Sequence, residues 1–294
     1  MHLDNIKNIL VPIDFSPASL VALEHAKYVA KETKAVLNLL HVHETPNFSS
    51  SLKKLLFKSD DDQQIVENSV DQDLKEIAAG LPSDLAHNVM IRKASSKIYK
   101  EIIEAAREIR ADLILIGTHG STITDSFVGG SNTFRVACLS QCPVISVHSD
   151  SGNRGIKNIV LPLDNSRETR EKVDDAIAIA KLFKSTIHLT TVSVSHDEVV
   201  KNRLMRVTEQ VKNYIEEDKI EVITNYFVGE NITELTLRYA NKISADLIVI
   251  MTEQESNFSG IFMGPTSQQM INHSYIPVMS IRPKDTDGAA VAPY

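Results

Sequence analysis

Residues 111–120 read A-D-L-I-L-I-G-T-H-G, with four consecutive apolar residues followed by a loop that glycines flank. A short apolar run bounded by turn residues is typical of a strand buried on both faces, as in a parallel sheet. The same opening, Ala-Asp-Leu-Ile, returns 134 positions later at residues 245–248. This stretch therefore predicts a parallel α/β sheet and its duplication.

The duplication extends along most of the chain. The tripeptide Lys-Asn-Ile at residues 7–9 recurs at 157–159, and the pair Pro-Val at 143–144 recurs at 277–278. The first offset is 150 and the second is 134, so the first copy is 16 residues longer (150 − 134). Such order-preserving identity indicates tandem domains. We expect them at residues 1–148 and 155–284, with a polar linker at 149–154 and a tail at 285–294.

Apolar runs and helical periodicity alternate in each copy, which predicts two doubly wound α/β domains with right-handed crossovers. In the first copy, Ser16 and Pro17 fit the N-cap and first positions of a helix. The other predicted helices of this copy cover about residues 64–79, 97–110 and 132–139. Its predicted strands cover residues 9–13, 36–42, 89–92, 113–116 and 144–147.

Composition narrows the class of partner. The net charge is −7 over 294 residues and tryptophan is absent, so the chain lacks the basic surface that nonspecific nucleic-acid binding requires. Its apolar runs are far shorter than the roughly 20 residues of a membrane helix, and residues 1–7 start no signal peptide. We expect a cytoplasmic protein with no nucleic-acid or membrane partner, in which Cys138 and Cys142 are reduced thiols.

The candidate site follows from where the strands end. In an open α/β sheet, ligands bind beyond the carboxyl ends of the strands, where the strand order reverses. Asp14 follows the first predicted strand and Val42 ends the second, while Gly117 begins a loop that reads Gly-Thr-His-Gly, nine residues, Gly130-Ser131. Glycines let the backbone approach a ligand, and the N–H groups before a helix cradle anions. The loop predicts a phosphate site.

The spacing Gly117-x2-Gly120-x9-Gly130-Ser131 resembles the nucleotide-binding motif of the ATP-binding branch of the universal stress protein family. The resemblance covers both repeats and points to a tandem member. It implies a five-stranded, mostly parallel sheet in each domain, with strand order 3-2-1-4-5 and helices on both sides. It also implies dimerisation through the final strand.

The resemblance further implies ATP as the ligand. It places Pro12, Asp14 and Val42 around the adenine, Ile116, Gly117 and Gly120 along the ribose and first phosphates, and Gly130, Ser131, Asn132 and Thr133 at the phosphate end. Any Mg²⁺ is expected on the phosphates, because no carboxylate cage is visible in the sequence. Asp14 also fits a simpler role, which is to cap the first helix together with Ser16.

The leading hypothesis is a stress-response or signalling protein that senses or carries ATP, with at most weak hydrolysis. The alternative is an ATP-using enzyme of similar fold, either a slow hydrolase or an adenylating enzyme. Adenylating relatives of this fold carry a Ser-Gly-Gly-x-Asp-Ser loop after the first strand, but residues 11–16 read V-P-I-D-F-S. No Walker lysine or activated nucleophile stands out, so we assign no catalytic residue. A flavin-binding subunit, which would be yellow, is a third hypothesis.

The second copy has lost most of the glycine loop. In register, Gly117 becomes Met251, Gly120 becomes Gln254 and Ser131 becomes Pro265, while Gly130 keeps its match at Gly264. Added side chains block the approach to phosphate, and proline lacks a donor. We expect one ATP per chain, and in the second copy either a filled pocket or a different ligand near Asp164.

Two polar groups receive simpler interpretations. His41, His43 and His119 lack the cysteine or carboxylate that would complete a metal-ligand spacing, so we expect core or solvated histidines and no metal site. The acidic run at residues 60–62 lacks the glycine and glutamate of a calcium loop and is expected as a solvated loop.

The last predicted strand of each copy, at residues 144–147 and 278–281, is an apolar edge candidate. An unpaired edge invites pairing with another strand. We expect the two copies to pair these strands across an approximate internal two-fold axis, and we leave further association into a homo-oligomer open.

Overall fold

A computed structural model of the chain describes residues 3–44, 60–94, 97–118, 132–152, 155–163, 168–252, 255–257, 260–262 and 265–283. The first half contains β1 (Asn8–Pro12), α1 (Pro17–Thr33), β2 (Val36–Glu44), α3 (Asp60–Ala79), β3 (His87–Ala94), α4 (Ile98–Glu108), β4 (Leu113–Gly117), α5 (Asn132–Leu139) and β5 (Val144–Val147). The second half contains β6 (Asn158–Leu163), α6 (Glu168–Phe183), β7 (Thr186–Ser193), α7 (Glu198–Glu216), β8 (Val222–Val228), α8 (Ile232–Lys242), β9 (Leu247–Met251), β10 (Glu255–Asn257), β11 (Gly260–Phe262), α9 (Pro265–His273) and β12 (Val278–Ile281).

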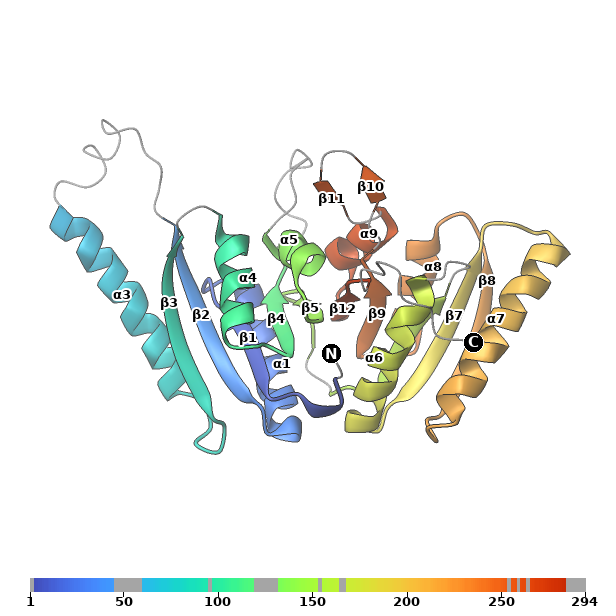
Figure 1. Cartoon of the computed structure of the whole chain (residues 1–294), viewed down its shortest axis with the longest axis horizontal. Helices are drawn as coiled ribbons and strands as arrows, with labels where there is room; N and C mark the ends of the chain where they lie inside the picture. The colour runs from blue at the N-terminus through green and yellow to red at the C-terminus, as the bar shows by residue number, and fades with distance from the viewer. Residues whose placement is uncertain are drawn as a thin grey trace.

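Ten strands form one continuous sheet in the order β3-β2-β1-β4-β5-β12-β9-β6-β7-β8 (Figure 1). Each half is a parallel five-stranded sheet with the predicted order 3-2-1-4-5. The halves meet where β5 and β12 pair antiparallel, with Ile145 opposite Met279. The structure thus confirms the tandem doubly wound fold and the expected pairing of the terminal strands.

Helices cover both faces of the sheet. One apolar core lies between the sheet and α1, α3, α6 and α7, and the other lies under α4, α5, α8 and α9. In β1, Ile9 and Val11 face the first core while Leu10 faces the second, and all three are fully buried. Because both faces are covered, the central strands contain unbroken apolar runs.

The repeat is visible in individual hydrogen bonds. Asp112 Oδ2 accepts from the backbone N–H groups of Lys7 and Asn8 at 2.8 and 2.9 Å. Asp246 Oδ2 accepts from Lys157 and Asn158 at the same two distances. Each carboxylate ties the start of the first strand of its half to the turn before the fourth. The repeated Ala-Asp-Leu-Ile stretch is therefore part of the scaffold.

The start of α3 differs from the prediction. The helix begins at Asp60, four residues before the predicted start, so the acidic run at residues 60–62 forms helix and not a solvated loop. Acidic residues are favoured in the first turn by the positive end of the helix dipole. The loop prediction was wrong because it considered the acidic run apart from the helix that follows it.

A hairpin of β10 and β11 follows β9 in the second half, with Ser256 opposite Ile261. The sequence pattern of residues 255–262 gave no prediction of this hairpin. The hairpin occupies the place in the repeat that the glycine loop occupies in the first half, and β11 lies beside α5. None of the helices in the described ranges is long and apolar enough to cross a membrane.

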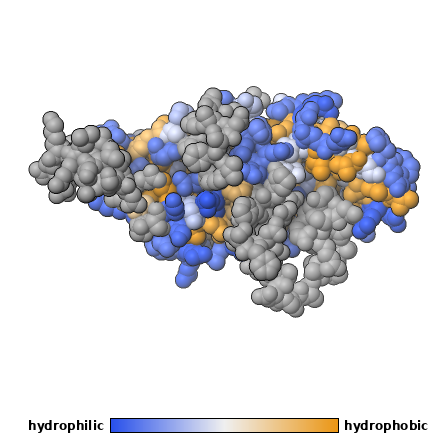
Figure 2. Space-filling model, turned by 90° about the horizontal axis from the view of Figure 1, so that it is seen from above, coloured by the Kyte–Doolittle hydropathy of each residue, from blue (hydrophilic) through white to orange (hydrophobic). Residues whose placement is uncertain are grey.

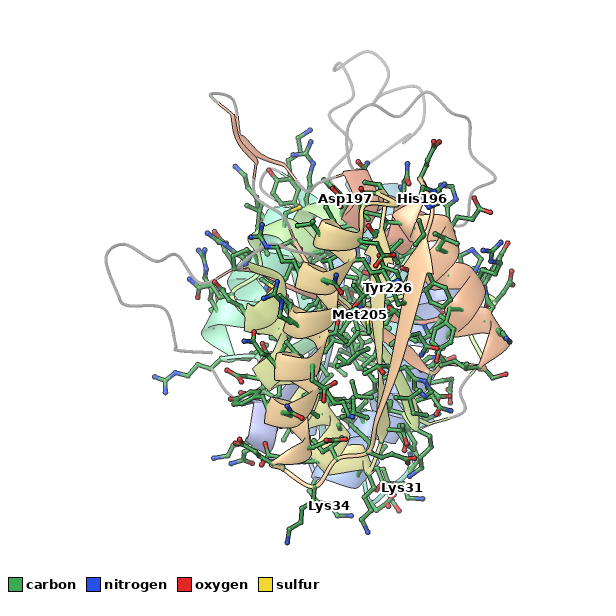
Figure 3. All side chains as sticks on the ribbon, turned by 90° about the vertical axis from the view of Figure 1, so that its right-hand side faces the viewer. Lys31, Lys34, His196, Asp197, Met205 and Tyr226 are labelled. Atoms are coloured by element: carbon green, nitrogen blue, oxygen red, sulfur yellow. The ribbon has the colours of Figure 1, made fainter. Side chains whose placement is uncertain are left out.

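The outer edges of the sheet are β3 and β8. Seen from above, the β8 end of the molecule shows a concentration of apolar surface (Figure 2). At this end, α7 packs along β7 and β8. Figure 3 shows the molecule with this end facing the viewer.

Candidate functional site

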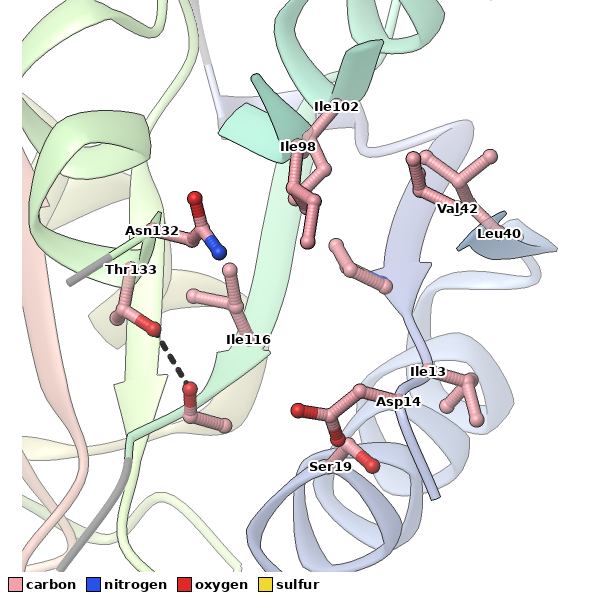
Figure 4. Close-up of a pocket in the computed structure, with 12 residues that line it drawn as sticks. Ile13, Asp14, Ser19, Leu40, Val42, Ile98, Ile102, Ile116, Asn132 and Thr133 are labelled. Carbon is pink, nitrogen blue, oxygen red and sulfur yellow. Dashed lines mark hydrogen bonds between the residues drawn. The ribbon is translucent and has the colours of Figure 1, made fainter. Parts of the chain in front are cut away.

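A cavity of about 90 Å³ lies beyond the carboxyl ends of β1, β2 and β4, beside α4 and α5 (Figure 4). The residues that line it are Pro12, Ile13, Asp14, Ser19, Leu40, Val42, Ile98, Ile102, Ile116, Gly117, Asn132 and Thr133. Every expected site residue that the structure describes is among them. Gly120, Gly130 and Ser131 lie outside the described residues.

One wall of the cavity is apolar. Leu40 and Ile102 are buried at 0% and 2% exposure, and Ile98 and Val42 complete the wall. Five lining residues were not predicted from the sequence: Leu40, Ile98 and Ile102 of this wall, and also Ile13 and Ser19. A signal was present, because Leu40 shares a strand face with Val42 at period two, and Ile98 and Ile102 share a helix face at i,i+4. Such a wall suits the flat face of a ring system.

A tight turn forms the polar rim opposite that wall. Asp14 Oδ1 accepts from the backbone N–H of Ser16 at 3.0 Å and from its hydroxyl at 2.6 Å. The Ser16 hydroxyl oxygen in turn accepts from the N–H of Ser19 at 3.2 Å as the N-cap of α1. Phe15 between them has φ of 63°, which bulky residues rarely adopt. Ser16 is therefore the N-cap, Asp14 supports it through these two hydrogen bonds, and the same turn holds the exposed Asp14 carboxylate at the rim.

Gly117 has a packing role in addition to the expected approach of its backbone to a ligand, which stays a prediction. A Cβ atom built on it would lie 2.6 Å from the backbone carbon of Ala18 and from the backbone nitrogen of Ser19. Its φ does not lie in the left-handed region, where Gly155 is the only glycine of the described chain. The glycine therefore allows the first turn of α1 to pack against the end of β4, which brings the Asp14 turn to the cavity.

The hydroxyl of Thr133 has a structural partner. Its Oγ1 donates to the carbonyl of Gly117 at 2.7 Å (Figure 4). In the second half, Ser267 Oγ donates to the carbonyl of Met251 at 2.8 Å. Because the bond occurs in both halves, this hydroxyl serves the scaffold in this conformation and is not a free phosphate donor. The exposed side chain of Asn132, at the N-terminus of α5, points toward the cavity.

The histidines of β2 belong to the face opposite Leu40 and Val42. His41 Nδ1 donates to the carbonyl of Ile13 at 2.7 Å, and burial lowers the pKa of His41, which favours the neutral ring. His43 Nε2 lies 3.0 Å from Asp71 Oδ1 and so connects β2 to α3. Within the described ranges, which leave out His119, no group of three or more metal-ligating side chains could hold an ion.

The equivalent place in the second half is packed differently. Met251, at the position of Gly117, is buried at 5% exposure among apolar residues on the α6 side of the sheet. Thr190 and Thr236, at the positions of Leu40 and Ile102, are fully buried. Both alternatives for this copy, a filled pocket or a different ligand, stay predictions, because Leu40 and Ile102 are equally buried and still line the cavity of the first half. Asp164, Gln254 and Gly264 lie outside the described residues.

Comparison with known proteins identifies relatives of both halves. The profile of the Universal stress protein family matches residues 5–148 and again residues 155–282. Universal stress protein YxiE of Bacillus subtilis is 30% identical over 143 residues, which are 47% of this chain and 97% of that protein. Universal stress protein A homolog 1 of Coxiella burnetii is 28% identical over 143 residues, which are 48% of this chain and 95% of that protein. The crystal structure of a universal stress protein from Archaeoglobus fulgidus covers 97% of this chain and 99% of its own, with a TM-score of 0.73 and 19% identity, a similarity of fold alone.

Proposed function

The chain belongs to the universal stress protein family, and from this premise we propose that its first half binds one ATP and acts as a sensor or carrier of the nucleotide. The observation that carries the proposal is the convergence of Asp14, Val42, Gly117 and Asn132 on one cavity. These residues come from four separate segments of the chain, and the glycine-spaced loop begins at that cavity.

The lining supports a division of the ligand into two parts. The apolar wall of Leu40, Val42 and Ile102 would cover the adenine ring, and the Asp14 carboxylate would accept from a ring amine. The cavity is smaller than the roughly 300–1,000 Å³ of a typical ligand pocket. The ribose and phosphates would therefore extend over the rim toward the N-terminus of α5, whose dipole favours anions.

A binding role is favoured over catalysis. The Asp14 carboxylate already accepts two hydrogen bonds from Ser16, so it is a poor candidate for a general base. Mg²⁺ would reach the site on the nucleotide phosphates. At most slow hydrolysis is expected, and phosphate release from purified protein measures it.

Titration calorimetry with Mg·ATP tests the proposal. The wild-type chain should bind one ATP, and Gly120→Val should abolish binding because a branched side chain would block the approach of backbone to phosphate. Gln254→Val is the matched control, because it introduces the same valine at the equivalent position of the second copy. It should retain full binding. Unchanged affinity in Gly120→Val, or two ATP molecules bound per chain, would overturn the assignment.

A further inference from the structure

The two outer edges of the sheet differ in chemistry. The sequence of β3, H-N-V-M-I-R-K-A, contains Arg92 and Lys93, and Arg92 forms an ion pair with Glu108. The sequence of β8, V-I-T-N-Y-F-V, contains no charged residue, no proline and no glycine. Natural proteins protect exposed edges with charges, above all lysine. Only β3 carries that protection.

Exposed apolar side chains occur on both faces of β8 and on the segment before it. Ile223 lies on the α8 face with Asn225 and Phe227, which contact Tyr239, while Val228 lies on the α7 face. Val194, Val199 and Met205 of the preceding segment, with Ile223 and Val228 of β8 itself, are 38–73% exposed. They account for five of the seven exposed large apolar side chains in the described residues. The outer edge of β8 is therefore flanked by apolar side chains and carries no charge that would oppose pairing with another strand.

The region between α7 and β8 also contains a buried polar group without a hydrogen-bond partner. Met205 lies on α7 and Tyr226 on β8, and these two elements pack against each other (Figure 3). The Tyr226 hydroxyl is buried and has no hydrogen-bond partner among the described residues. A strand added outside β8 would complete the backbone hydrogen bonds of the edge and cover this apolar side.

We propose that β8 pairs antiparallel with β8 of a second copy of this chain, about a two-fold axis through Asn225. In that register Val222 lies opposite Val228, and Ile223 lies opposite Phe227. Thr224 then lies opposite Tyr226. Aromatic and β-branched residues directly opposite each other stabilise antiparallel pairs, and no like charges meet.

A second copy is the favoured occupant because the chain already contains this type of interface. β5, with sequence V-I-S-V, and β12, with sequence V-M-S-I, are uncharged edges that pair antiparallel and continue the sheet. Pairing of β8 with β8 of a second copy would form the same type of antiparallel interface at the outer end of the sheet. The charges of Arg92 and Lys93 oppose the same pairing at β3, so the assembly closes as a two-fold dimer and does not grow into a fibre.

Sedimentation equilibrium on the full chain tests the dimer. The wild type should approach twice its monomer mass of 32.6 kDa as concentration rises into the tens of micromolar. Ile223→Lys and Thr224→Lys should remain monomeric, because each places two lysines near the axis. Leu20→Lys is the matched control, since Leu20 on α1 is 39% exposed and Ile223 is 41% exposed, and it should dimerise like the wild type.

Hydrogen exchange at the same concentrations supplies a second measurement. Amides of β8 should become slower to exchange as the wild-type concentration rises, and should not do so in Ile223→Lys. A wild type that stays monomeric, a dimer that both lysine variants retain, or a β8 protected only by an added extended peptide would each overturn the proposal. The outcome is independent of ATP binding, because the ATP cavity lies in the other half.

Discussion

The two halves share their scaffold but differ at the position that ends the fourth strand. Both tie the first strand with an aspartate, and in both a hydroxyl donates to the carbonyl of that position. The first half has Gly117 there and the second has Met251. Gly117 lets the first turn of α1 pack closely against the end of β4, beside the cavity, while Met251 is a buried side chain at the equivalent position. The comparison teaches that the hydrogen bonds of the scaffold are the same in both halves while the packing at the end of the fourth strand is not.

Substituting each of these two residues by the other should give the largest change in the free energy of unfolding. Met251→Gly removes a buried side chain, and comparable truncations cost about 2–5 kcal/mol, to which glycine adds about 0.5–1 kcal/mol. Gly117→Met forces a side chain against the backbone of α1, and such overpacking costs about 1–3 kcal/mol. Urea unfolding followed by circular dichroism measures both. A loss below about 1 kcal/mol in either variant would contradict the proposed role of this position.

Removal of the two scaffold carboxylates should give equal, smaller losses. Asp112→Ala and Asp246→Ala each delete an acceptor of two strand N–H groups, which is expected to cost about 1–3 kcal/mol. The two losses in urea unfolding should agree within about 0.5 kcal/mol. Asp73→Ala, on the exposed side of α3, is the control and should change stability by less than about 0.5 kcal/mol. Unequal losses would show that the scaffold itself has diverged.

Acid should affect the second half through His188, where the first half has Asn38. His188 contacts Tyr239 and Asn158, and burial lowers its pKa below 6.5 although Glu221 opposes the shift. The unfolded chain therefore takes up this proton first, so stability is constant above about pH 6.5 and falls as pH drops below it.

His188→Asn should reduce that loss. The difference in urea midpoint between pH 7.5 and pH 5.5 should shrink in the variant, although His25 and His41, whose pKa values burial also lowers, keep part of it. If His188→Asn loses as much stability between pH 7.5 and pH 5.5 as the wild type, His188 does not contribute to the fall in stability at acid pH.

The smallest expected effect is a gain at the strands that join the halves. Ser146 in β5 and Ser280 in β12 occupy equivalent positions, and both hydroxyls are buried with no hydrogen-bond partner among the described residues. Ser146→Ala and Ser280→Ala remove an unsatisfied polar group and should each raise stability by up to about 1 kcal/mol in thermal unfolding. A loss in one variant alone would reveal a partner that only that serine has.

The fold could be predicted because its signals are local. Apolar runs such as residues 113–116 and the two repeat offsets predicted the duplicated parallel α/β fold, the apolar terminal strands predicted the pairing of β5 with β12, and the strand order came from the family resemblance. The packing role of Gly117 could not be predicted, since it depends on contact with Ala18 and Ser19, about 100 residues earlier. The apolar wall was missed in part because Ile98 and Ile102 reach the cavity from a helix outside the motif.

The antiparallel pairing of β5 with β12 within one chain also bears on how the protein changes over generations. In a dimer of identical single-domain subunits, every substitution enters both sites at once, and the assembly dissociates on dilution. Here the two partners are linked through residues 148–157, so each meets the other at an effective concentration in the millimolar range whatever the amount of protein present. Each half can then accept substitutions that the other does not share, and Met251 is such a substitution.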